Sequence, residues 1–238
     1  MRMDSHNHLG IRKGENFPTS EIIRWMDKAK LDACVITGHP EAINNDYIAK
    51  AQAEHPDRLF GFAVVNPWDF GAEDELRRAV EDLRLLGLKL NPLRHGYALD
   101  RHEIVDPIFE ICQEYGIPVL VHGCSDQFNM PGKFDEMARA FPKVNIIMAH
   151  IGEPDAIDAA IRVAKRRENI YVDTAGIILS TLQKAIKEIP SEKILMGTDA
   201  PWGYFELSMQ LVERATEDRR IQDMIMGENI ARLLNIKM

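Results

Sequence analysis

Two histidines one residue apart, His6 and His8, stand near the start of the chain. On a β-strand, residues i and i+2 point to the same face, so the two imidazoles project together. Two adjacent imidazoles are a usual beginning of a site for zinc or a similar transition metal. A lone His-x-His pair is a weak signal, and it becomes specific only where later strands supply further ligands at their ends.

Later apolar stretches end in residues that could complete such a site. These residues are Lys89, His122, His150, Asp173 and Asp199. Alternation along 88–90 turns Lys89 inward, and alternation along 119–122 does the same for His122. Histidine and aspartate are standard ligands for zinc, manganese and iron. Asp173 fits a structural carboxylate equally well, and Asp199 alone could cap the turn that follows it.

The elements that must position these residues alternate between short apolar strands and amphipathic helices. The strands are predicted at 2–9, 33–37, 59–65, 87–90, 117–122, 144–150, 170–173 and 194–199. The helices are predicted at 20–30, with Ser20 as the N-cap, and at 42–54, 72–86, 107–115, 133–141, 154–167 and 178–188. Two more helices follow, the last at about 229–234, and 10–19 reads as a polar loop.

This alternation implies parallel strands joined by right-handed crossovers. Roughly eight such units predict an α/β fold, a (β/α)8 TIM barrel over residues 1–238 with extra C-terminal helices and one domain. An open doubly wound sheet is the competing architecture. It would carry a glycine-rich phosphate loop after an early strand, and the sequence has none.

In a barrel the active site lies at the C-terminal ends of the strands, so the residues above should converge there. Arg94 and His95 follow the fourth strand on the same side, where Arg94 either binds a substrate carboxylate or, equally well, belongs to a solvated loop. The remaining loop histidines, His39 among them, are expected on the solvated surface. Of the cysteines, Cys124 reads as a bystander near His122 and the other two as core.

The composition of the chain limits the kinds of partner that we expect the protein to bind. A net charge of −8 disfavours nucleic acid and anionic membranes as partners. The sequence shows neither a secretory signal nor an apolar run long enough to span a membrane. Three cysteines without a C-x-x-C pair fit a reducing compartment. We therefore expect a cytoplasmic protein that acts on a small molecule.

Several motifs together resemble the amidohydrolase superfamily. They are the Asp-Ser-His-Asn-His run at 4–8, His122 after an apolar strand, Ala-His-Ile-Gly at 149–152 and Gly-Thr-Asp at 197–199. The closing segment 227–234 resembles that of the branch called amidohydrolase family 2. This branch includes aminocarboxymuconate-semialdehyde decarboxylase and related hydrolases. The resemblance spans almost the whole chain.

The resemblance implies a role for each matching residue. His6, His8, His122 and Asp199 match ligands of a divalent metal, and Asp199 also handles a proton. His150 matches a residue that polarises water or substrate, or binds a second metal in two-metal relatives. Lys89 falls where dihydroorotase and phosphotriesterase carry a lysine carboxylated by carbon dioxide. One metal is favoured, zinc before manganese or iron, and a second at Lys89 and His150 stays open. Relatives are often dimers, which makes a homodimer an expectation.

The leading hypothesis is a metal-dependent hydrolase. A metal-activated water would attack a small carboxylated or cyclic amide, lactone or ester. Non-oxidative decarboxylation by the same branch is the alternative, because the ligand set does not separate the two. A PHP-type phosphoesterase would show more histidines and acidic residues along its middle strands, and a TatD-like nuclease would have glutamate at Lys89. A barrel that holds metal without catalysis is the non-enzymatic alternative.

Overall fold

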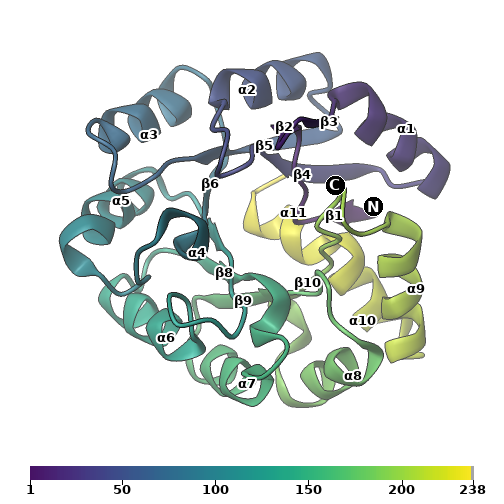
Figure 1. The fold of residues 1–238 in the computed structure, drawn as a ribbon. Helices are drawn as coiled ribbons and strands as arrows, with labels where there is room; N and C mark the ends of the chain where they lie inside the picture. The colour runs from purple at the N-terminus through teal and green to yellow at the C-terminus, as the bar shows by residue number, and fades with distance from the viewer. Residues whose placement is uncertain (237–238) are drawn as a thin grey trace.

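Eight short parallel strands form a ring in the computed structural model, which describes residues 1–236 (Figure 1). The strands are β1 (Met3–Asp4), β4 (Ala33–Thr37), β5 (Leu59–Val64), β6 (Gly87–Leu90), β7 (Val119–Val121), β8 (Ile146–Met148), β9 (Ile170–Asp173) and β10 (Ile194–Leu195). Their order in the sheet follows the chain. The ring closes beyond β10, where Asn7 bridges Ala200 in parallel. The (β/α)8 barrel is thus confirmed, while residues 237–238 of the predicted domain lie outside the described residues.

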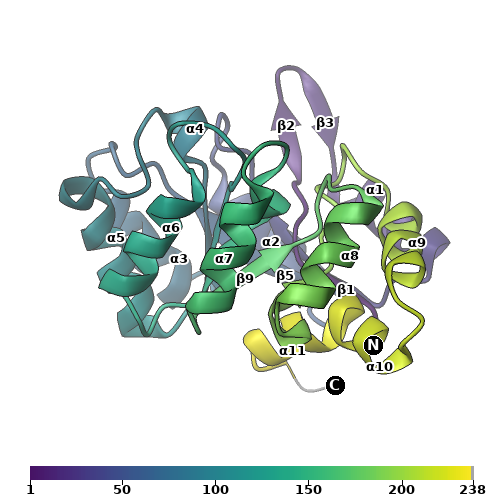
Figure 2. The same cartoon turned by 90° about the horizontal axis from the view of Figure 1, so that it is seen from below.

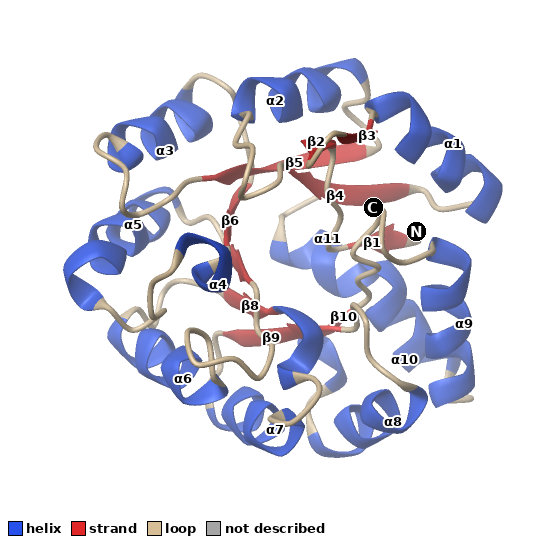
Figure 3. Ribbon diagram, in the orientation of Figure 1, coloured by secondary structure: helices blue, strands red, loops and turns tan. Residues whose placement is uncertain are grey.

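Helices surround the strands on the outside (Figure 3). They are α1 (Thr19–Ala29), α2 (Asn45–Glu54), α3 (Ala72–Glu81), α5 (His102–Tyr115), α6 (Pro131–Ala140), α7 (Ile157–Arg166) and α8 (Leu179–Glu188). A one-turn helix, α4 (Pro92–His95), follows β6. After β10 come α9 (Phe205–Ala215), α10 (Arg219–Asp223) and α11 (Asn229–Leu233). Among the described helices, none is both long and apolar enough to cross a membrane.

Strand alternation produces two apolar layers. Leu88 and Leu90 pack outward into the large core between the strands and the helices. Leu120 and Ile147 point inward and form a smaller core with Ile230 of α11. Figure 2 shows α10 and α11 together at one end of the barrel, opposite the end where α4 lies. The inner core is therefore closed on the side of α11, and the other end remains available for a site.

The structure corrects several predicted boundaries. Residues 10–17, predicted as a polar loop, form an antiparallel hairpin of β2 (Gly10–Arg12) and β3 (Glu15–Phe17). This hairpin projects from the end of the barrel that carries α4 (Figure 2). Pro18, not Ser20, occupies the N-cap of α1. Helix α5 begins at His102, so Pro107, its predicted first residue, lies inside it.

Gly123 allows the chain after β7 to approach the chain after β8 closely. A Cβ atom at Gly123 would lie 2.5 Å from the Ala149 carbonyl oxygen and 2.6 Å from Met148 Cγ. We predict that Gly123→Ala lowers the unfolding free energy by about 1–3 kcal/mol through overpacking. Chemical denaturation measures this loss. Gly132→Ala, on an exposed position of α6 with no atom within 4 Å of the added Cβ, is the control and should be neutral or slightly stabilising.

Candidate metal centre

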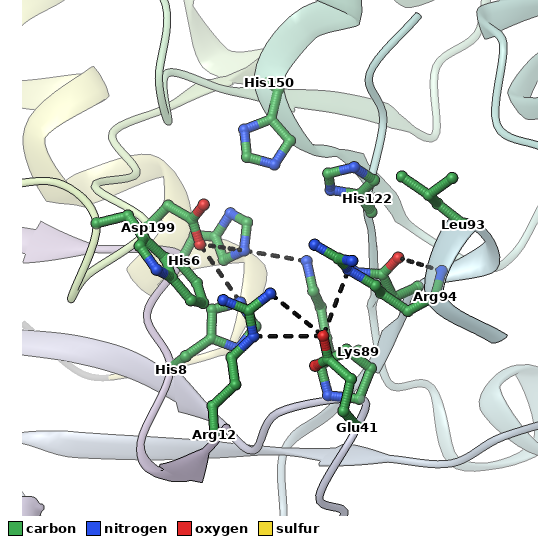
Figure 4. Close-up of a pocket in the computed structure, with 13 residues that line it drawn as sticks. His6, His8, Arg12, Glu41, Lys89, Leu93, Arg94, His122, His150 and Asp199 are labelled. Carbon is green, nitrogen blue, oxygen red and sulfur yellow. Dashed lines mark hydrogen bonds and ion pairs between the residues drawn. The ribbon is translucent and has the colours of Figure 1, made fainter. Parts of the chain in front are cut away.

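A cavity of about 280 Å³ opens at the end of the barrel where the strands have their carboxyl ends. Its position matches the expectation for a barrel of this type. Figure 4 shows its polar wall, to which residues from many strand ends contribute. The lining residues are His6, His8, Arg12, Pro40, Glu41, Lys89, Asn91, Leu93, Arg94, His122, His150, Asp199 and Trp202.

Three side chains in this cavity converge on one point. His6, His8 and Asp199 each offer a ligand atom, and these atoms lie within 4.8 Å of one another. Asp199 Oδ1 is 3.4 Å from His6 Nε2 and 3.3 Å from His8 Nε2. The His-x-His pair and the last strand end therefore meet, as the sequence predicts.

Hydrogen bonds at Nδ1, on the side of each ring opposite Asp199, fix the orientation of His6 and His8. His6 Nδ1 lies 2.9 Å from Asp173 Oδ2, and His8 Nδ1 lies 2.9 Å from the Gly38 carbonyl oxygen. A carboxylate and a carbonyl only accept hydrogen bonds, so each Nδ1 donates. In the neutral form of each ring, the remaining lone pair lies on Nε2 and faces Asp199. Such hydrogen bonds typically orient histidines that bind metals.

Asp199 supplies the test of whether a cation fits. Its Oδ1 is buried and has no hydrogen-bond partner among the described residues. With both rings neutral, the carboxylate oxygen of Asp199 and the Nε2 lone pairs of His6 and His8, all of them acceptors, therefore lie close together. This arrangement of acceptors is what a divalent metal requires.

The buried carboxylate of Asp4 connects the chain after β1 with the chain after β10 through hydrogen bonds. Asp4 Oδ1 accepts hydrogen bonds from the His6 backbone N–H at 2.9 Å and from Asn7 Nδ2 at 2.8 Å. The same oxygen accepts from the Thr198 backbone N–H at 3.2 Å. Thr198 precedes Asp199, whose φ of 58° lies in the left-handed region that side chains rarely adopt. Asp4 therefore helps to hold Asp199 in that strained backbone, next to the two histidines.

Lys89 points into the barrel, as its alternation with Leu88 and Leu90 predicts. The side chain is buried, and Nζ lies 3.0 Å from His6 Nε2. Burial lowers the pKa of Lys89 to about 8, although Asp199 and Asp173 oppose part of that shift. The amine thus contacts the His6 lone pair that a metal would use, and an ion bound there would displace it.

A neighbouring cluster contains His122, Cys124 and His150, whose ligand atoms also lie within 4.8 Å of one another. His122 therefore groups with His150, whose ring centroid lies 5.4 Å from that of His6 in the first group. His150 Nδ1 donates to the Ala175 carbonyl oxygen at 2.9 Å, which leaves Nε2 toward the cavity. Burial and the nearby His150 lower the pKa of His122 to about 2, so this ring is neutral.

The other predicted site residues take different positions. Arg94 lines the cavity. His95 is not among the lining residues, because its Nε2 donates to the Pro40 carbonyl oxygen at 2.9 Å. Asp173 is 1% exposed and lies behind His6, so it supports the site without facing the cavity.

Sequence reasoning missed several residues in and beside the cavity. His39, expected on the surface, is buried and stacks on His8 with ring centroids 5.2 Å apart. Arg12, Glu41 and Trp202 line the cavity, but the sequence analysis did not select them. All three residues follow the end of a predicted strand closely. Arg12 and Glu41 share this position with the predicted ligands, and it could have identified them. Cys124, read as a bystander, belongs to the second cluster.

The fold and these residues agree with a family comparison. The amidohydrolase family model matches residues 22–236. The chain therefore belongs to the amidohydrolase family, whose members are enzymes.

Several of the named relatives are decarboxylases. The chain is 25% identical to gamma-resorcylate decarboxylase from Polaromonas sp., with 76% of each chain covered. The structure resembles 5-carboxyvanillate decarboxylase from Sphingomonas paucimobilis, with a TM-score of 0.82, 17% identity and 99% of each chain covered. It also resembles dihydroxybenzoic acid decarboxylase from Polaromonas sp., solved with manganese and 2-nitroresorcinol. There the TM-score is 0.78 and the identity 17%, with 99% of this chain and 97% of that one covered.

Asp173 offers a test of the centre that leaves all cavity residues in place. Its Oδ1 accepts from the His150 and Ala175 backbone N–H groups, so in Asp173→Asn the amide NH₂ must turn toward His6. His6 Nδ1 would then accept, and its Nε2 would carry the proton. We predict that manganese affinity, measured by titration calorimetry, falls roughly 10–100-fold.

The control for this substitution is Asp158→Asn, on an exposed carboxylate of α7 that pairs with Lys184. It should bind manganese like the unmodified protein. A folded Asp173→Asn variant with unchanged affinity would show that the His6 tautomer does not govern the centre.

Proposed function

We propose that this chain is a divalent-metal-dependent decarboxylase that removes carbon dioxide from a small carboxylic acid. The observation that carries the proposal is the convergence of His6, His8 and Asp199 on one point of a cavity. The sequence favours hydrolysis by the same ligands. The gamma-resorcylate decarboxylases among the relatives support decarboxylation as the better hypothesis.

The proposed ligands are His6, His8 and Asp199, with His122, which lines the same cavity, as a fourth. A bound divalent ion would act as a Lewis acid that anchors the carboxylate of the substrate. Histidine with carboxylate suits zinc and manganese alike, and manganese is present in one related structure. We propose one ion at this centre, with Lys89 as a free amine.

Decarboxylation needs a proton at the carbon that loses its carboxylate. The bond to the carboxylate breaks, its electron pair forms the new C–H bond, and carbon dioxide leaves. An aspartate such as Asp199 is ionised at neutral pH, which suits a ligand better than an acid. His150 is the proposed donor, because its Nδ1–H is engaged by Ala175 and a protonated ring presents Nε2–H to the cavity.

The surroundings of the centre suit an anionic substrate. Lys89, Arg12 and Arg94 all line the cavity. The cysteines Cys34, Cys112 and Cys124 are all free, which supports the proposed cytoplasmic location of the enzyme.

The reaction class can be tested directly. The metal-free protein is supplied with Mn²⁺ or Zn²⁺ and incubated with hydroxybenzoates and muconate-type acids, and with a panel of lactones, amides and esters. We expect carbon dioxide release from at least one acid, and its loss after chelation. Hydrolysis of panel compounds without any carbon dioxide release would instead support the hydrolase.

Replacing His150 tests the proton donor. His150→Gln should lower kcat by about 10²–10⁴, the usual contribution of a general acid, while manganese content stays unchanged. His55→Gln, outside the cavity lining, is the control and should keep full activity. Equal turnover by His150→Gln and the unmodified enzyme would remove His150 from the mechanism.

A further inference from the structure

Two arginines share one carboxylate on the wall of the cavity (Figure 4). Arg12 Nη2 lies 3.2 Å from Glu41 Oε1, and Arg94 Nε lies 3.4 Å from the same oxygen. The three residues come from separate segments, namely the hairpin, the loop after β4 and helix α4. Because one carboxylate balances only one guanidinium, the group keeps one positive charge in excess.

The Arg12 guanidinium is partly sheltered and the Arg94 side chain is 44% exposed, and both have donors to spare. The Arg12 side chain is 21% exposed, and its Cζ lies 4.8 Å from the centroid of the Trp202 ring. This stacking holds the guanidinium plane in position. The terminal nitrogens of Arg94 have no hydrogen-bond acceptor among residues 1–236. Arginine presents donors in a fork that matches a carboxylate, so the pair can receive a further anion.

The size of the cavity limits what can reach both of its polar regions. Ligand cavities commonly span roughly 300–1,000 Å³, and this one, at about 280 Å³, lies at the small end. An occupant must therefore be compact, such as a single ring or a short open chain. Under the proposed function, the carboxylate that is lost lies at His6, His8 and Asp199. The arginines are then left to bind a different part of the same molecule.

We propose that the substrate is a small dicarboxylate, whose retained carboxylate displaces Glu41 and binds Arg12 and Arg94. This inference rests on the proposed function for the position of the other carboxylate. In the free protein, Glu41 occupies the place of the substrate group and keeps the guanidinium groups oriented. An acid with an uncharged distal group gains no such contact, so the arginines select for a second negative charge.

The test compares two ligands that differ in that charge alone. Isophthalate and 3-carbamoylbenzoate have the same ring and nearly the same shape, and both bind without requiring turnover. Titration calorimetry on the manganese-loaded protein should find isophthalate bound at least 10-fold more tightly. Arg12→Gln and Arg94→Gln should each weaken isophthalate by roughly 10-fold or more, as for loss of a charge-assisted hydrogen bond. The same variants should change 3-carbamoylbenzoate by less than about 3-fold.

Glu41→Gln should act in the opposite direction. Removing the competing negative charge frees both arginines, so isophthalate affinity should rise several-fold while 3-carbamoylbenzoate affinity stays constant. Arg139→Gln, on a surface arginine of α6 that pairs with Glu136, is the control and should change neither affinity.

Three results would overturn the inference. They are equal affinity for the two ligands, an equal loss of both in the arginine variants, and no binding of either isophthalate or the open-chain glutarate. Carbon dioxide assays separate this inference from the proposed function. Arginine-dependent isophthalate binding without carbon dioxide release from any acid would refute decarboxylation alone. Decarboxylation of monocarboxylates with a KM unaffected by Arg12→Gln and Arg94→Gln would refute the dicarboxylate alone.

Discussion

A single buried carboxylate, that of Asp173, orders the centre from behind. One oxygen accepts from His6 Nδ1, and the other accepts from the backbone N–H groups of His150 and Ala175. Burial raises the pKa of Asp173, but its contacts with His6 and His150 outweigh that effect and keep it below the usual range. A buried anion is tolerated only when hydrogen bonds replace its lost hydration, and here both oxygens have them. Asp173 thereby controls both the lone pair of His6 and the left-handed backbone of His150.

The two ends of the barrel have different roles: one holds an apolar core that stabilises the fold, and the other holds the site. At one end, Leu120 and Ile147 meet α11 in an apolar core. Toward the other end, inward positions are taken by Lys89, next to Leu120 in the strand register, and by His122 beyond β7. The polar groups are thus supported by a closed apolar layer beneath them. Inward-facing positions therefore form the apolar core in one half of the barrel and line the site in the other half.

Alternation and strand ends predict most of the fold and much of the centre. The leucines around Lys89 require the outer core, so the direction of Lys89 follows from sequence alone. The hairpin at 10–17 could not be predicted in this way, because its strands lack an alternating apolar pattern and Ile11 is exposed. Without the hairpin, Arg12 has no predicted place in the cavity.

Other contacts depend on approaches between distant segments that no local pattern encodes. His39 is buried because it packs against His8 and Trp202, the latter far along the chain. The grouping of Cys124 with His150 depends on the close approach of two chain segments at Gly123. The role of Asp173 likewise depends on which ring nitrogen it contacts, and sequence leaves that open.

Because the hairpin projects from the barrel, its residues can be substituted separately from the ligands at the strand ends. Arg12 sits on a two-stranded ribbon outside the barrel, whereas His6 and His8 precede it at the barrel end. Residues 10–17 could therefore diverge, or be exchanged by a protein engineer, while the chemistry at the strand ends stays intact. A substitution at Arg12 would thus alter the cavity wall while His6, His8 and Asp199 stay in place.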